Sequence, residues 1–112
     1  MGMVKEIFEE RKKYFENLDI YLKEILNLVR SILPSARIYL FGSVVKGNYA
    51  IGLSDIDIAI VSEEFENKEK KLEILDILLQ RFFDSPFEFH LLSEKQWNYY
   101  LKFIGKDYKE VK

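Results

Sequence analysis

Two aspartates separated by one residue, Asp55 and Asp57, are the side chains of this sequence best suited to chemistry. Asp55 precedes the segment 56–61 and Asp57 lies within it; the other residues of this segment are apolar and mostly β-branched, which is typical of a strand. Side chains two residues apart on a strand point to the same face, so the two carboxylates would lie close together. Like charges at that separation repel each other, and a divalent cation is the usual compensation. The spacing therefore predicts a metal site.

A Gly-Ser pair, Gly42-Ser43, ends an apolar run at 36–41 that also resembles a strand. Glycine lets the backbone approach a phosphate closely, and N–H groups at a helix start bind phosphate oxygens. Lys46 lies three residues further on and could reach the same phosphate. The alternatives are an ordinary N-cap serine and a solvated lysine. A phosphate-binding turn twelve residues before the first aspartate outlines a nucleotidyl-transfer site.

Glu88 is the candidate third carboxylate, within a segment in which apolar and polar residues alternate at 87–91. If this strand lies beside the strand at 56–61, Glu88 can face Asp57 across the ladder. Its alternative role is an acid on a solvated sheet face. His90 shares the face of Glu88, where it either touches substrate or a metal-bound water or is a plain polar residue.

The surrounding pattern predicts the elements that must position these residues. Apolar residues at helical spacing run from 4 to 33 and fit one long helix or two helices broken near Asn17, with Asp19 capping the second. Further helices are expected at 43–47, 67–83 and 93–104, the last opened by a capping box at Ser93 and Gln96. A third strand is expected at 86–92, and the charged tail from Gly105 is expected to fray.

These elements give an α/β (α+β) fold with a small mixed sheet and helices mainly on one face. The passage from 56 to 92 is long enough for a crossover, which favours a parallel pair of strands. The short connection from 41 to 56 favours an antiparallel pair. One domain is expected over 1–112, with an N-terminal helical segment (1–34), a catalytic sheet (36–92) and a C-terminal helix (93–104).

The charge balance limits the partners of this domain. The 112 residues carry 17 basic and 19 acidic side chains, a formal net charge of −2, which disfavours a nucleic-acid partner. The absence of cysteine excludes thiolate metal sites, and no apolar run suggests a membrane span. A cytoplasmic protein is expected. Three aromatic residues off the apolar stripe of the last helix are candidates for a partner surface: Tyr99, Phe103 and Tyr108.

The stretch from Phe41-Gly42-Ser43 to Asp55-Ile56-Asp57-Ile58 resembles the signature of the DNA polymerase beta nucleotidyltransferase superfamily. The resemblance covers 36 to about 96, and the short length is similar to the minimal nucleotidyltransferases, often encoded beside a HEPN-domain protein as a toxin–antitoxin pair. It implies that Gly42 and Ser43 bind the triphosphate and that both aspartates bind two Mg²⁺ ions. A third acid on a later strand completes such a site, and Glu88 matches it. Val44-Val45 and a glutamate in place of aspartate depart from the pattern.

The resemblance implies a Mg²⁺-dependent enzyme that moves a nucleoside monophosphate, AMP from ATP, onto a hydroxyl. The implied acceptor is a tyrosine of a HEPN toxin, with this chain as the antitoxin. Two alternatives remain: a non-catalytic nucleotide-binding antitoxin that neutralises its partner by contact, and a transferase for small molecules. The N-terminal helical segment could pack within the domain, against a second copy or on the partner, so a homo- or hetero-oligomer is possible.

Overall fold

A mixed β-sheet forms the centre of the molecule in the computed structural model, which describes residues 2–51 and 53–112. Within these residues the strands are β1 (Arg37–Phe41), β2 (Ile56–Val61), β3 (Phe87–Leu92) and β4 (Tyr108–Glu110), in the order β3-β2-β1-β4. β1 pairs with β2 antiparallel, and β2 pairs with β3 parallel, as the connection lengths predicted. The parallel pair needs the crossover between β2 and β3. The predicted mixed-sheet α+β fold is confirmed.

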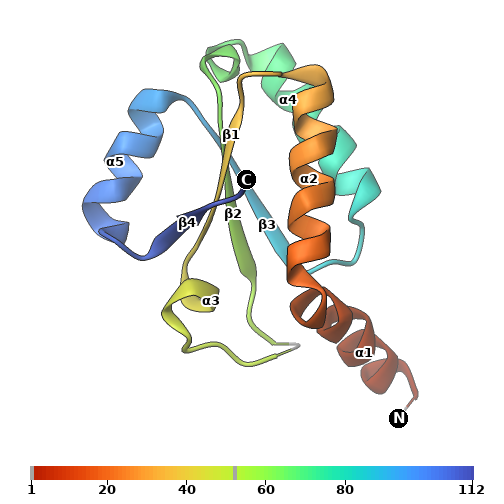
Figure 1. Ribbon diagram of the computed structural model, residues 1–112. Coiled ribbons are helices and arrows are strands. Elements are labelled where there is room, and N and C mark those ends of the chain that lie inside the picture. Colours follow the sequence, from red (N-terminus) through yellow and green to blue (C-terminus); the bar gives the residue numbers. More distant parts are fainter. Residues whose placement is uncertain (1, 52) are drawn as a thin grey trace.

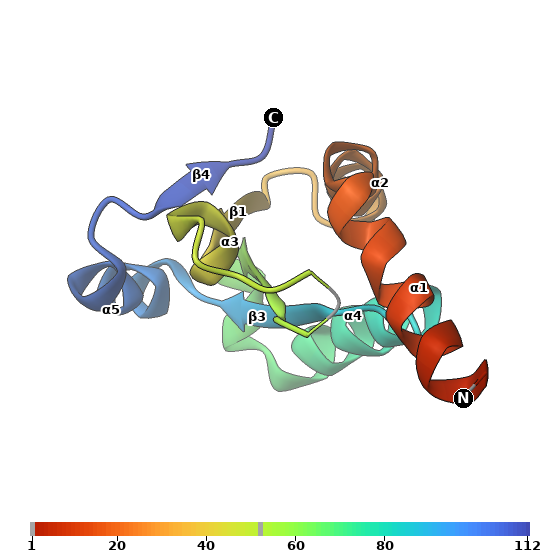
Figure 2. The ribbon, with the colours of Figure 1, turned by 90° about the horizontal axis from the view of Figure 1, so that it is seen from below.

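The helices cover both faces of the sheet unequally. They are α1 (Gly2–Glu16), α2 (Leu18–Ile32), α3 (Ser43–Lys46), α4 (Lys68–Arg81) and α5 (Glu94–Ile104), with a 3₁₀ turn at Glu63–Glu66. Figures 1 and 2 show α2 and α4 on one face and α5 on the other. Within the described part of the chain, no helix is both long and apolar enough to cross a membrane.

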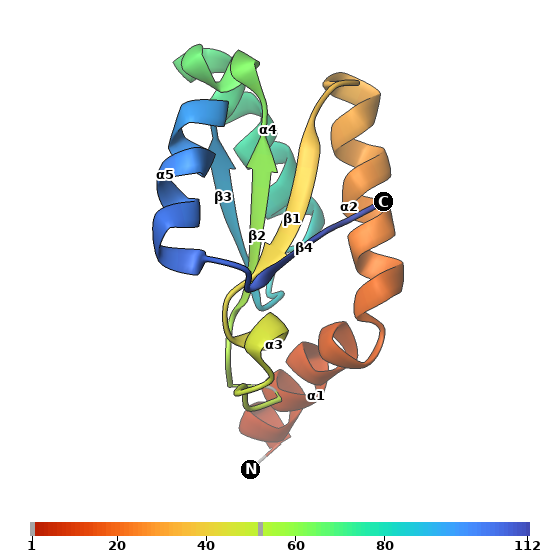
Figure 3. The ribbon, with the colours of Figure 1, turned by 60° about the vertical axis from the view of Figure 1, so that its left-hand side comes forward.

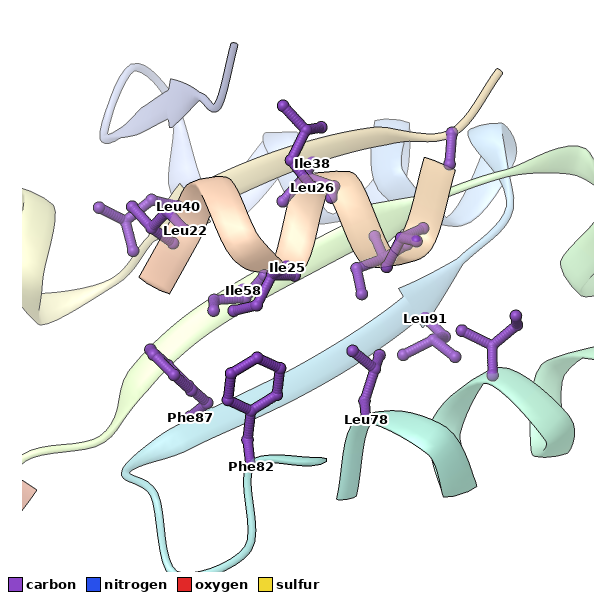
Figure 4. Close-up of a cluster of buried hydrophobic side chains, with 14 of the residues drawn as sticks. Leu22, Ile25, Leu26, Ile38, Leu40, Ile58, Leu78, Phe82, Phe87 and Leu91 are labelled. Atoms are coloured by element: carbon purple, nitrogen blue, oxygen red, sulfur yellow. The ribbon is translucent and has the colours of Figure 1, made fainter. Parts of the chain in front are cut away.

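The main core lies between the sheet and the α2–α4 face. Alternate residues of β2, namely Ile56, Ile58 and Ile60, are fully buried there. Figure 4 shows Ile25 and Leu26 of α2 above this face of the sheet, and Leu78 of α4 beside it. The period of two in the strand and the apolar stripes of the helices together account for this layer.

A second cluster occupies the opposite face, under α5. It contains Tyr39 and Phe41 of β1, Ala59 and Val61 of β2, and Leu92 and Trp97. Tyr39 and Trp97 stack with ring centroids 4.6 Å apart. The same face of β2 begins with Asp57, so apolar burial on this face gives way to acidic residues at the start of the strand.

The N-terminal pattern forms two helices, separated at Asn17. Asn17 occupies the cap position of α2 without a capping side-chain bond, because its side chain instead donates to the carbonyl of Lys13. Asp19 lies in the first turn and is not the cap. Figures 1 and 3 show α1 at the end of the sheet where α3 lies, which brings it near the residues preceding β2.

The expectation of a frayed tail after Gly105 is wrong. Residues 108–110 form β4, which pairs antiparallel with β1, and the Val111 N–H donates to the carbonyl of Ile38. The Tyr108 ring also contacts the rings of Tyr39 and Trp97. The charged sequence masked this strand because all three of its residues are exposed. Its stability comes from the edge of β1 rather than from an apolar pattern.

Replacing Ile58 by alanine is expected to lower the free energy of unfolding by about 2–5 kcal/mol, because a fully buried side chain would leave a cavity beneath α2. Urea denaturation followed by circular dichroism measures this loss. Ile20→Ala is the matched control, since Ile20 is 68% exposed on α2 and its removal is expected to change stability by less than about 0.5 kcal/mol. Equal losses for the two variants would contradict the described core.

Candidate active site

The site is built on the pairing of β2 with β3. Asp57 and Glu88 are direct partners in the parallel register, so their side chains stand next to each other on the face opposite the main core. The Asp57 side chain is 24% exposed and that of Glu88 is 54% exposed. The two acids therefore meet at the surface as the sequence predicted, and each raises the energetic cost of the other's charge.

His90 joins these two carboxylates from the same strand face. Its Nε2 lies 3.2 Å from Asp57 Oδ1 and 3.8 Å from Glu88 Oε1. One ligand atom from each of the three residues lies within 4.8 Å of the others. The sequence had left the role of His90 open, and the structure places it at the centre of the acidic group. The Glu-x-His alternation in β3 was the signal for this placement.

Asp55 lies apart from this group. It precedes β2, is well exposed, and its Oδ1 lies 3.5 Å from Arg11 Nη2. The same guanidinium nitrogen donates to the carbonyl of Ser54 at 2.9 Å. The contact ties α1 to the entry of β2. Sequence reasoning missed Arg11, because no local pattern connects two residues that are 44 positions apart.

Gly42 brings the predicted phosphate turn into contact with the acidic group. It has φ 84° and ψ −155°, a conformation that is essentially restricted to glycine. A Cβ placed on Gly42 would lie 3.2 Å from Asp57 Cγ and closer still to Asp57 Oδ2. The Asp57 carboxylate thus occupies the space that any other residue at position 42 would fill.

The short helix α3 starts directly after this glycine, as predicted. Lys46 and Val45 donate their backbone N–H groups to the carbonyl of Gly42, and Gly47 ends the helix in the left-handed conformation. Ser43 is the first helical residue and is half-buried, whereas Lys46 is exposed. The first turn of a helix leaves its earliest N–H groups without helical partners. The Ser43 and Val44 N–H groups therefore have no partner within α3, and Gly42, the residue before them, lies against the Asp57 carboxylate.

The donor set fits a divalent cation. Carboxylate oxygens are the ligands that Mg²⁺ and Mn²⁺ prefer, and an imidazole nitrogen is compatible with Mn²⁺ and other first-row ions. Asp57, Glu88 and His90 provide both kinds of donor within a short distance. A cation held there would offset the repulsion between the two carboxylates. Asp55 could contribute only after its carboxylate leaves Arg11.

Comparisons with known proteins identify the family of the chain. The model of the family described as "Nucleotidyltransferase domain" matches residues 22–111. A crystal structure described as "putative nucleotidyltransferase" is 48% identical, with a TM-score of 0.74, over 82% of this chain and 98% of that chain. A "putative nucleotidyltransferase from Sulfolobus solfataricus" is 25% identical, with a TM-score of 0.56, over 93% of this chain and 84% of that chain.

A search of the curated proteins found no match. The family model nevertheless spans both halves of the site, from the helix before β1 to the edge strand β4. The relative at 48% identity is covered over nearly its whole length. The fold and these matches agree: the chain belongs to the family of nucleotidyltransferase domains.

Proposed function

We propose that this protein is a divalent-cation-dependent enzyme that transfers AMP from ATP to a hydroxyl group of a protein partner. The observation that carries the proposal is the contact between Gly42 and the Asp57 carboxylate. It joins a turn suited to phosphate with a group of residues suited to a cation, within one van der Waals contact. Nucleotidyl transfer requires these two functions side by side, because the cation and the N–H donors act on the same phosphates.

Each residue has a role in this proposal. Gly42 and Ser43 hold the triphosphate through backbone N–H groups and the Ser43 hydroxyl, and Lys46 offers a charge to its outer phosphate. Asp57 and Glu88 hold the cation, and Asp55 completes the ligand set. A divalent ion bound there would neutralise phosphate charge and acidify the attacking hydroxyl. The family resemblance favours two Mg²⁺ ions, held by Asp55 and Asp57.

The proposed transfer of AMP to the acceptor hydroxyl forms one bond to phosphorus and breaks one. The acceptor oxygen forms a bond to the α-phosphorus of ATP, and the bond from that phosphorus to pyrophosphate breaks. The acceptor proton passes to the Glu88 carboxylate, which is open to solvent and can release it. The remaining contribution of the protein is positioning and charge stabilisation.

A protein acceptor fits the charge of the chain and the exposed aromatic side chains of α5 better than a nucleic acid does. The net charge of −2 provides little attraction for a polyanion. Tyr99 and Phe103 are exposed on α5 and contact each other, while Tyr100 of the same helix reaches His90. Exposed aromatic residues are enriched in protein interfaces. A tyrosine of a HEPN-domain toxin is the acceptor that the family resemblance favours, which would make this chain an antitoxin.

A second candidate function is neutralisation of the partner by binding alone. The position of Asp55 favours it, since the Asp55 carboxylate faces Arg11 and not the acidic group. A site that kept this arrangement with nucleotide bound would lack one ligand of the proposed set. A small-molecule acceptor remains an outcome of the same test.

The deciding experiment incubates the protein with each of four α-³²P-labelled nucleoside triphosphates, Mg²⁺ and the protein encoded beside it. Label on a tyrosine of that partner, strongest with ATP, is the expected result. Neutralisation of the partner without label from any nucleotide would replace the enzymatic proposal by the binding one.

Ser43→Ala is expected to weaken ATP binding about tenfold, because it removes about one hydrogen bond to a charged group. Calorimetry measures this loss.

A further inference from the structure

His90 lies between the acidic group and two aromatic rings, those of Phe41 and Tyr100. Its Nε2 faces Asp57 and Glu88, while its Nδ1 lies 3.4 Å from the Tyr100 hydroxyl of α5. The Phe41 ring lies 5.1 Å from the imidazole ring, between centroids, and the Tyr100 ring lies 5.8 Å away. The imidazole is 20% exposed. Both of its nitrogens therefore have defined neighbours.

This arrangement permits two tautomers with different consequences. When the Tyr100 hydroxyl donates to Nδ1, the proton lies on Nε2, which then donates to Asp57 Oδ1. When Nδ1 carries the proton, it donates to the Tyr100 oxygen, and the lone pair of Nε2 points toward the two carboxylates. A hydroxyl can serve either tautomer because it both donates and accepts. Tyr100 can therefore stabilise either tautomer of His90: the one that donates to Asp57, or the one whose free Nε2 can bind a cation.

The second tautomer has the organisation of a metal-binding histidine. Such residues place one ring nitrogen toward the ion and donate the other ring N–H to a neighbouring oxygen. Nε2 lies close to an oxygen of each carboxylate, and the Tyr100 oxygen supplies the outer contact. The contact between Gly42 and Asp57 is an independent sign that this carboxylate is held in one fixed place.

We propose that His90 is a nitrogen ligand of the divalent cation and that Tyr100 is a positioning residue that fixes its tautomer. The site is then a mixed nitrogen and oxygen site that binds Mn²⁺ more tightly than Mg²⁺. The inference rests on the proposed function only in treating Asp57 and Glu88 as cation ligands. It goes beyond that function, because a site of three carboxylates would contain no nitrogen donor.

The preference for Mn²⁺ follows from the donor atoms. Mg²⁺ is a hard ion that retains water and binds oxygen, whereas an imidazole nitrogen suits softer first-row ions. A nitrogen ligand therefore adds more to the affinity for Mn²⁺ than to that for Mg²⁺. Removing the imidazole should therefore lower the affinity for Mn²⁺ more than the affinity for Mg²⁺. A residue that merely shapes the site would change the two affinities alike.

The experiment measures bound Mn²⁺ directly by electron spin echo envelope modulation on the full chain without substrate. Modulation from imidazole ¹⁴N is expected in the wild-type protein at equimolar Mn²⁺ and should be absent in His90→Gln. Calorimetry should show Mn²⁺ affinity falling by at least about tenfold in His90→Gln and by about tenfold in Tyr100→Phe, with Mg²⁺ affinity changed less. Tyr21→Phe is the control, since it removes a phenol from the opposite face of the sheet.

Bound Mn²⁺ without ¹⁴N modulation in the wild-type protein, or no Mn²⁺ binding at all, would overturn this inference. The wild-type spectrum does not depend on whether any variant folds. Oxygen-only coordination together with AMP transfer would leave the proposed function standing without a histidine ligand. Nitrogen-bound Mn²⁺ without transfer to any acceptor would support the ligand and reject the proposed function.

Discussion

Asp57→Asn is expected to reduce nucleotidyl transfer at least about 10²–10³-fold, because it removes a charge from the centre of the proposed cation site. The asparagine has the same shape as aspartate and can keep its place beside Gly42 and His90. The rate of label transfer from α-³²P-labelled ATP, at saturating Mg²⁺ and Mn²⁺ in turn, measures the loss.

The same substitution is expected to leave stability unchanged or to raise it by about 1 kcal/mol without added metal, since it removes repulsion from the neighbouring Glu88. Thermal and urea unfolding of the metal-free protein test this part. A variant that loses activity while keeping stability identifies Asp57 as a functional residue. A variant that loses both would indicate that the carboxylate is needed for the fold.

Asp76→Asn provides the control for Asp57→Asn. It removes the same charge from an exposed position on α4, which covers the opposite face of the sheet. Its transfer rate is expected to equal that of the wild-type protein. If the two variants lost activity equally, net charge rather than the acidic group would be the cause, and the site as described would be wrong.

Gly42→Ala is expected to lower both stability and activity. The backbone conformation alone costs a residue with a Cβ about 1–3 kcal/mol, and the added carbon would overlap the Asp57 carboxylate. Relief of that overlap must move the phosphate turn or the acid. A displacement of about 1 Å can reduce a positioned reaction about 10²-fold. Urea denaturation and the transfer assay measure the two effects, and Mn²⁺ calorimetry shows whether cation binding falls with them.

Gly105→Ala is the matched control, because it has a positive φ of 64° but no heavy atom within 4 Å of an added Cβ. It carries the backbone strain without the overlap, so it is expected to lose stability and keep its affinity for Mn²⁺. The difference between the two variants isolates the contact with Asp57. Unchanged cation affinity in Gly42→Ala would show that the turn and the acid are independent of each other.

The pairing of β1, β2 and β3 and the proximity of Asp57 to Glu88 were predictable from local patterns. Alternation at 87–91 and the crossover length were enough to place Glu88 beside Asp57, since both properties are set by short segments of chain. β4 was not predictable, because its residues are exposed and it is held by the edge of β1. An apolar pattern reports burial, and this strand has none.

The rest of the site depends on contacts between distant segments. The approach of Gly42 to Asp57 and the contact of Arg11 with Asp55 arise from tertiary packing, which leaves no periodic trace in the sequence. Tyr100 lies on the inward-facing side of α5, and its ring packs against the apolar cluster beneath that helix. Its hydroxyl contact with His90 was missed, because a stripe predicts which side chains are inward but not what their polar ends meet.

The register of β3 against β2 gives the site an unexpected safeguard against misfolding. A slip of one residue would turn Glu88 and His90 into the main core and expose Phe87 and Leu91 to water. Burial of the apolar side chains on the far face therefore fixes the register of β3, and with it the positions of Glu88 and His90. A core substitution that shifted this register would displace Glu88 and His90, so an inactive variant need not carry any change in the site itself.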